Sequence, residues 1–163
     1  DVCSSDPGVS AWAEAGTALS YRSRTDVARA TPDYRGGLVV ARLFGTALEA
    51  EQPGWFTETA NDVVYISRFD NDVILVSQNK IGRTVRRNMQ AFASWNVNTD
   101  ARRQYWANFV ELGGGVRLRW ASLPPNVHFT LQGLRGVHTR NEGNPRRPNY
   151  FDIRAGFWYA ITR

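Results

Sequence analysis

Charged side chains at alternate positions mark two segments of the chain, residues 110–120 and 151–161. The intervening positions in each segment are mostly apolar, and residues 11–22 show a weaker alternation of the same kind. Because successive side chains of a strand point to opposite faces, each segment is predicted to be a strand with one apolar and one charged face. The charged faces carry Glu14, Glu111, Arg117, Arg119, Asp152 and Arg154.

If these faces line a shared interior, the six side chains would form a network of ion pairs. An unpaired charge in a confined, weakly hydrated space is costly, so each carboxylate needs a partner. Glu111 lies mid-strand between Val110 and Leu112, and its side chain must point away from the apolar face. We therefore expect Glu111 to pair with Arg154 or Arg117. The alternative is a solvated face that carries unrelated charges.

Three pairs of adjacent arginines lie at or near expected turns: Arg86 and Arg87, Arg102 and Arg103, and Arg146 and Arg147. They suit contacts with lipid phosphate groups or an acidic partner, and plain solvation is the alternative. The net charge is +5, and the only lysine is Lys80. Nucleic acid is not an expected partner, because the basic residues are not interleaved with stacking aromatics on one face.

No pattern of residues predicts catalysis or a cofactor. His128 and His138 have no neighbouring cysteine or second histidine at a metal-ligand spacing. Cys3 is the single cysteine, which excludes a disulfide within the chain and a site with several cysteine ligands. Residues 113–115, three glycines, are not followed by the helix and lysine of a phosphate-binding loop. We expect a protein that is not an enzyme and holds neither metal nor cofactor.

Alternation with period two and turn residues between the alternating segments predict an all-β fold. The expected strands are residues 11–22, 34–44, 56–69, 72–85, 90–97, 110–120, 127–137 and 151–161. Residues 99–106 could begin a capped helix, but the alternation after Phe109 favours a turn. The length of 163 residues suits one domain, expected at 11–163 after an extended lead-in at 1–10. We predict about eight antiparallel strands in a closed up-and-down barrel, with a soluble β-sandwich as the alternative.

The same alternation suits a soluble barrel and an outer-membrane barrel, which differ in which face meets solvent. Two features favour the membrane. Small residues share the charged face (Gly113, Gly115, Gly156 and Ala160) and leave room for long arginine side chains. Aromatic residues also gather near the expected strand ends, as at a membrane interface. The alternative interpretation is that aromatics pack in any β core and glycines mark bulges in any curved sheet.

Three stretches carry a more specific signal: residues 62–82 (DVVYISRFDNDVILVSQNKIG), 106–119 (WANFVELGGGVRLR) and 143–160 (GNPRRPNYFDIRAGFWYA). Together they resemble the C-terminal barrel region of NfrA-type phage-adsorption proteins and their relatives in exopolysaccharide export. The resemblance covers about residues 60–161. It implies an outer-membrane location and a non-enzymatic role in passage or attachment.

This chain departs from that family in three ways. These 163 residues show no helical repeats like those that precede the family's barrel, and their last three residues, Ile161-Thr162-Arg163, include no aromatic. Eight strands would also fill their own lumen with side chains, which excludes passage of a polysaccharide. We therefore expect a structural or interaction protein of the bacterial outer membrane. Its expected partners are outer-membrane lipid or lipopolysaccharide and other envelope proteins. A soluble periplasmic accessory subunit of a membrane complex is the alternative, and an envelope enzyme ranks third.

Overall fold

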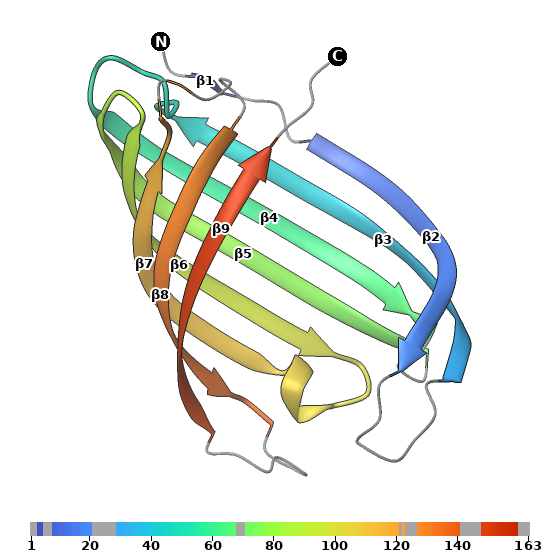
Figure 1. Ribbon diagram of the computed structural model, residues 1–163. Helices are drawn as coiled ribbons and strands as arrows, with labels where there is room; N and C mark the ends of the chain where they lie inside the picture. Colours follow the sequence, from blue (N-terminus) through green and yellow to red (C-terminus); the bar gives the residue numbers. More distant parts are fainter. Residues whose placement is uncertain are drawn as a thin grey trace.

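The computed structural model of the chain is an antiparallel β-sheet that curves strongly around an interior (Figure 1). It describes residues 3–4, 8–20, 29–67, 71–120, 122, 127–140 and 148–159. Within these ranges, side chains are not described for residues 3–4, 17–20, 29–31 and 158–159. The candidate residues Arg146 and Arg147 lie outside the described residues.

The strands follow one another in an up-and-down meander, and β2 to β9 each pair antiparallel with the next. They are β1 (Cys3–Ser4), β2 (Gly8–Ser20), β3 (Arg29–Gly45), β4 (Gly54–Ile66), β5 (Asp72–Arg86), β6 (Met89–Asp100), β7 (Phe109–Leu118), β8 (Val127–His138) and β9 (Asn149–Tyr159). The short β1 pairs with the end of β3. All eight expected strands are present, and the all-β single-domain class is confirmed.

The segment between β6 and β7 is a turn, as the sequence favoured. β6 continues to Asp100, and one 3-10 turn at Tyr105–Ala107 precedes β7. Asp100, Asp72 and Asn108 hold this connection in place. Asp72 accepts hydrogen bonds from the backbone N–H groups of Val73 and Arg102 at 2.8 and 3.2 Å. The Asn108 amide donates to Asp100 and to the Gln104 carbonyl oxygen.

The prediction of a closed barrel is wrong for the described residues. β2 pairs only with β3 and β9 only with β8, so the sheet has two open edges. Beside the cavity, the inward faces of β2 and β3 carry the small residues Gly8 and Ala41, which are opposite each other in register. Further along, the same faces carry large residues, among them Trp12 and Arg35. A cavity therefore remains where side chains would otherwise fill an eight-stranded lumen.

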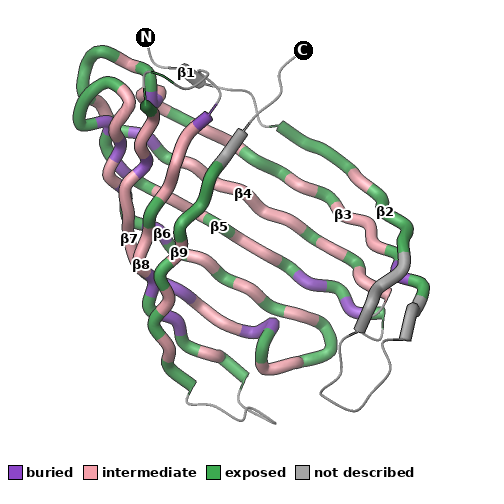
Figure 2. The backbone as a smooth tube through the Cα atoms, viewed as in Figure 1, coloured by how far each residue is buried: buried purple, intermediate pink, exposed green. Residues whose placement is uncertain are grey.

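The outward face of the sheet is largely apolar, and the inward face is partly polar and charged. Exposed residues alternate with buried or half-buried ones along the strands (Figure 2). The outward positions carry large apolar side chains that are exposed, among them Leu38, Trp55, Leu75, Leu112 and Ile153. The buried inward positions mix apolar residues (Phe56, Ile74, Phe92 and Leu134) with polar and charged ones (Asp72, Thr84, Gln90, Ser94, Glu111 and Arg117).

Close packing inside the sheet depends on a glycine at one interior position of β5. A Cβ atom at Gly82 would lie 2.7 Å from Cβ of Phe92 and 2.8 Å from Cε1 of Phe56. Both rings are buried, so neither can move without disturbing its neighbours. Gly82 therefore allows the two phenyl rings to meet over β5.

We predict that Gly82→Val lowers the stability by about 1–3 kcal/mol, because the added atoms would overpack the two rings. Gly16→Val is the matched control, since a Cβ at Gly16 has nothing within 4 Å. Thermal unfolding followed by circular dichroism measures both. Equal unfolding temperatures for the two variants would contradict this account of the packing.

Candidate functional site

The interior holds a buried carboxylate, Glu111, at the centre of a hydrogen-bonded cluster. Its side chain is 1% exposed. Arg154 of β9 donates from both terminal nitrogens to Glu111, at 2.5 Å to Oε1 and 2.9 Å to Oε2. Asn96 of β6 donates to Oε2 at 2.9 Å, and the Tyr150 hydroxyl donates to Oε1 at 2.8 Å. The expected arginine partner is therefore Arg154, which also donates from Nε to Asp152 at 2.8 Å.

Tyr150 reaches Glu111 because a glycine lies between them on β8. Gly136 pairs in register with Glu111 on one side and with Tyr150 on the other. A Cβ atom at Gly136 would lie 2.1 Å from Cζ of Tyr150, inside the space that the ring occupies. The tyrosine ring thus crosses β8 over Gly136 to complete the shell around the carboxylate.

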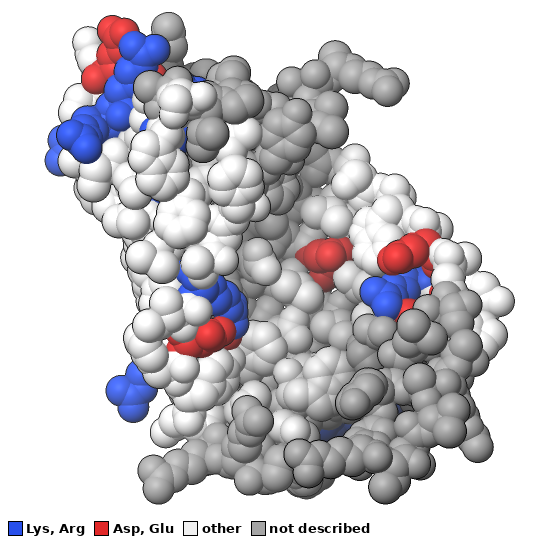
Figure 3. Space-filling model, in the orientation of Figure 1, with Lys and Arg blue, Asp and Glu red and all other residues white. Residues whose placement is uncertain are grey.

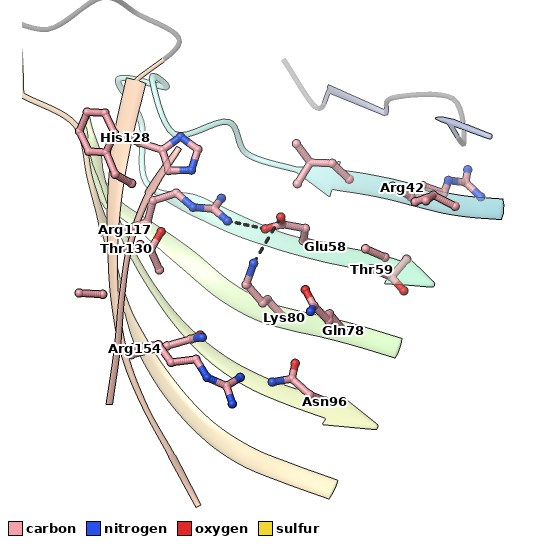
Figure 4. Close-up of a pocket in the computed structure, with 18 of the residues that line it drawn as sticks. Arg42, Glu58, Thr59, Gln78, Lys80, Asn96, Arg117, His128, Thr130 and Arg154 are labelled. Atoms are coloured by element: carbon pink, nitrogen blue, oxygen red, sulfur yellow. Dashed lines mark hydrogen bonds and ion pairs between the residues drawn. The ribbon is translucent and has the colours of Figure 1, made fainter. Parts of the chain in front are cut away.

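A second cluster joins Arg117 of β7 to residues of β4, β5 and β6. Arg117 donates to Glu58 Oε2 at 2.6 Å and to Gln90 Oε1 at 3.1 Å. Lys80 donates to the other oxygen of Glu58 at 3.5 Å. Figure 4 shows Lys80 and Arg117 facing Glu58 from two sides. Two cations share one carboxylate in this Lys80–Glu58–Arg117 triad, which leaves it a formal charge of +1.

The six charged residues expected to share an interior do not form one network. Arg119 pairs instead with Glu49 at 3.4 Å, near the β5–β6 turn. Glu14 lies 4.0 Å from Arg35, and its side chain is 63% exposed. Arg35 itself bonds more closely to Asp33, at 2.5 Å. These charged residues lie at different positions along their strands. Each therefore pairs with a nearby residue, and the six do not all meet at one site.

Sequence reasoning missed Glu58, Lys80 and Gln90 of the second cluster, and Asn96 and Tyr150 of the first. The alternation in residues 56–69 and 72–85 is less regular, so it did not assign Glu58 and Lys80 to one face. These two residues are directly opposite in the β4–β5 register. Opposite charges at facing strand positions are a usable signal once a register can be proposed.

The adjacent arginines lie at opposite ends of the sheet. Arg86 ends β5, and Arg87 in the following turn pairs with Glu51 at 3.5 Å on the surface. Arg102 and Arg103 lie in the connection after β6, at the other end. The face in Figure 3 shows charged side chains in small groups of both signs, separated by uncharged surface. These described arginines thus form no common basic patch.

A cavity of about 1170 Å³ opens beside the two charge clusters. Lys80, Glu58, Arg117 and Arg154 line it, together with His128 and the side chains of Gln78, Asn96, Thr130 and Gln132 (Figure 4). Residues of both edge strands, Gly8 and 153–157, also border it. The expectation that eight strands would fill their own lumen is therefore wrong for the part of the chain described here.

The described residues contain no group of three or more His, Cys, Asp or Glu side chains that could hold a metal ion. His138 contacts the backbone instead: its Nδ1 lies 3.0 Å from the carbonyl oxygen of Tyr105. No helix in the described ranges is long and apolar enough to cross a membrane. Comparison with known proteins finds no matching family model, curated protein or solved structure.

We predict that Glu111→Gln lowers the free energy of unfolding by about 3 kcal/mol, the lower end of the cost of breaking a buried ion pair. We expect the lower value because Arg154 would still pair with Asp152 in the variant. Glu14→Gln should cost less than about 1 kcal/mol, because its pair with Arg35 is long and exposed. Thermal or denaturant unfolding measures both. Equal small shifts would mean that the Glu111 cluster is not closed to water.

Proposed function

We propose that this chain is an outer-membrane protein, built on a curved, barrel-like β-sheet, with a structural or interaction role and no catalytic activity. The observation that carries the proposal is the inverted polarity of the sheet. Large apolar side chains cover the outward face, and charged residues pair with each other inside. Membrane barrels have this arrangement because lipid surrounds their outer face. In water it would expose many large apolar side chains on one face, and in a soluble protein such a patch marks an interaction site or an aggregation hazard.

The positions of the aromatic side chains support this orientation in a bilayer. Tyr34 lies on the outward face in the first half of β3, Tyr65 lies near the end of that face on β4, and Phe151 lies near its start on β9. These three stand at one end of the sheet, and Phe44, Trp55 and Phe157 stand at the other. Exposed aromatics at both ends of an apolar band suit the two membrane–water interfaces.

Four polar residues on the outward face of β4 and β5 bond to one another, which lowers the cost of placing them in lipid. On β4 and β5, Thr59 donates to Asn79 at 2.8 Å, Asn79 donates to Ser77 at 3.0 Å, and Asn61 donates to Thr59 at 3.3 Å. The guanidinium of Arg42 lies 3.9 Å from the centre of the Phe44 ring, close to the end of β3. Such a side chain can extend toward the interface.

The resemblance to NfrA-type barrels suggests the kind of role. The paired charges take up part of the interior, which fits attachment or assembly in the envelope better than free passage of a polymer. Outer-membrane lipid or lipopolysaccharide and other envelope proteins are the proposed partners. A soluble periplasmic β-sandwich subunit would need two facing sheets around an apolar layer. The single curved sheet with a charged interior does not favour that alternative.

The proposal predicts that neighbouring residues of β8 meet different surroundings in lipid vesicles. Leu131 faces outward, and Thr130 lines the cavity. In a Cys3→Ser background, Leu131→Cys and Thr130→Cys would each carry a thiol-linked fluorophore. Lipids with spin-labelled acyl chains should quench the fluorophore strongly at position 131 and weakly at position 130.

Equal weak quenching at both positions, with recovery of the protein by osmotic shock alone, would favour the soluble subunit and overturn the proposal. Recovery from the outer-membrane fraction only with detergent would agree with the proposed location. A gel band that shifts on heating would give the same support.

A further inference from the structure

The cavity beside the charge clusters has two chemically different walls. One wall consists of the charged and amide side chains around Lys80 and Arg117 (Figure 4). The other consists of Val39, Ala41 and Leu43 on the inward face of β3, with Ala60 beside them on β4. Its volume of about 1170 Å³ exceeds the usual range of small-ligand pockets, about 300–1,000 Å³. It has room for a ligand with both a polar and an apolar part.

The apolar wall leads from the charged wall to the open edges of the sheet. Leu43 pairs in register with Glu58, and Glu58 pairs with Lys80, so the apolar wall begins next to the triad. At the far side the cavity reaches Gly8 of β2 and Ile153 and Phe157 of β9. β2 and β9 are not paired with each other in the described chain, so no backbone hydrogen bonds close the sheet on this side of the cavity.

The charges of the two clusters distinguish where a ligand's anionic group would bind. Arg154 pairs with both Glu111 and Asp152, so this cluster has a formal charge of −1 and does not attract a further anion. The Lys80–Glu58–Arg117 triad keeps an excess of one positive charge. Lys80 has three N–H donors, and its contact with Glu58 is long at 3.5 Å. The side chain of Lys80 is also 23% exposed, so an incoming anion can reach the ammonium group.

We propose that the cavity binds an anionic amphiphile with a single acyl chain. Its carboxylate or phosphate head would lie at Lys80 and complete the charge balance of the triad. Its chain would follow Val39, Ala41 and Leu43 toward the unpaired edges of β2 and β9. This inference uses the cavity alone and does not require the outward face to meet lipid, so its test is independent of the proposed function.

The single lysine of the chain provides a direct test. The protein is held in the neutral detergent dodecyl maltoside, and the rate at which an amine-acylating reagent modifies Lys80 is read from the mass of its peptide. Myristate and dodecyl phosphate, as carboxylate and phosphate probes, should each slow the reaction about tenfold at ten times their dissociation constant. Acetate and inorganic phosphate at the same concentrations should leave it unchanged. Slowing by one amphiphile alone would identify the head group and still support the site.

A matched control moves the lysine to the other face of the same strand. Arg83 lies on the outward face of β5, three residues after Lys80. In the double variant Lys80→Gln with Arg83→Lys, amphiphiles should not slow the modification of the only lysine. An equal slowing there would mean that the probes act at the detergent surface, and it would overturn the site.

Direct binding gives a second measurement. Lys80→Gln should weaken binding of myristate or dodecyl phosphate about tenfold, which corresponds to about 1.4 kcal/mol. Circular dichroism of the variant checks that the sheet remains folded. Unchanged binding, unchanged protection of Lys80, or equal protection by acetate would each overturn the proposal.

Discussion

A buried carboxylate needs a counter-charge, and the arrangement of the last three strands depends on meeting that need. Glu111 on β7 takes two hydrogen bonds from Arg154, although β8 lies between β7 and β9. The arginine therefore reaches across the interior side of an entire strand. Gly136 makes the same crossing possible for Tyr150. The sheet must bend enough at β8 for these groups to meet, so the ion pair and the local curvature are linked.

Polar pairing occupies much of this interior beside the apolar contacts. Apolar packing inside is limited to groups such as Phe56 and Phe92 over Gly82. Around them, Arg117, Gln90 and Thr84 form a buried chain of hydrogen bonds. A polar network of this kind is favourable only when its members are satisfied, since a lone buried charge costs several kcal/mol. The interior therefore tolerates an apolar exchange better than the loss of a single partner.

Strand positions and the two faces could be predicted from the sequence, because the period of two is strong in segments such as 110–118 and 151–157. The same pattern predicted that Glu111 faces inward and needs an arginine. It did not choose between Arg154 and Arg117, because that choice depends on the register across β8. Glu58 and Lys80 were missed for the same reason: a charge pair between neighbouring strands is visible only after their register is known.

Closure of the sheet could not be predicted, because it depends on interior volume instead of periodicity. Eight strands are expected to close on a lumen that side chains just fill. Here Arg117 and Tyr150 take up interior space at β7 and β9, whereas Gly8 and Ala41, opposite each other on β2 and β3, leave space beside the cavity. The cavity therefore follows from small residues at one level of β2 and β3, since other inward positions of these strands carry large side chains such as Trp12 and Arg35. The positive triad borders this cavity, where an ion can meet both a charged and an apolar surface.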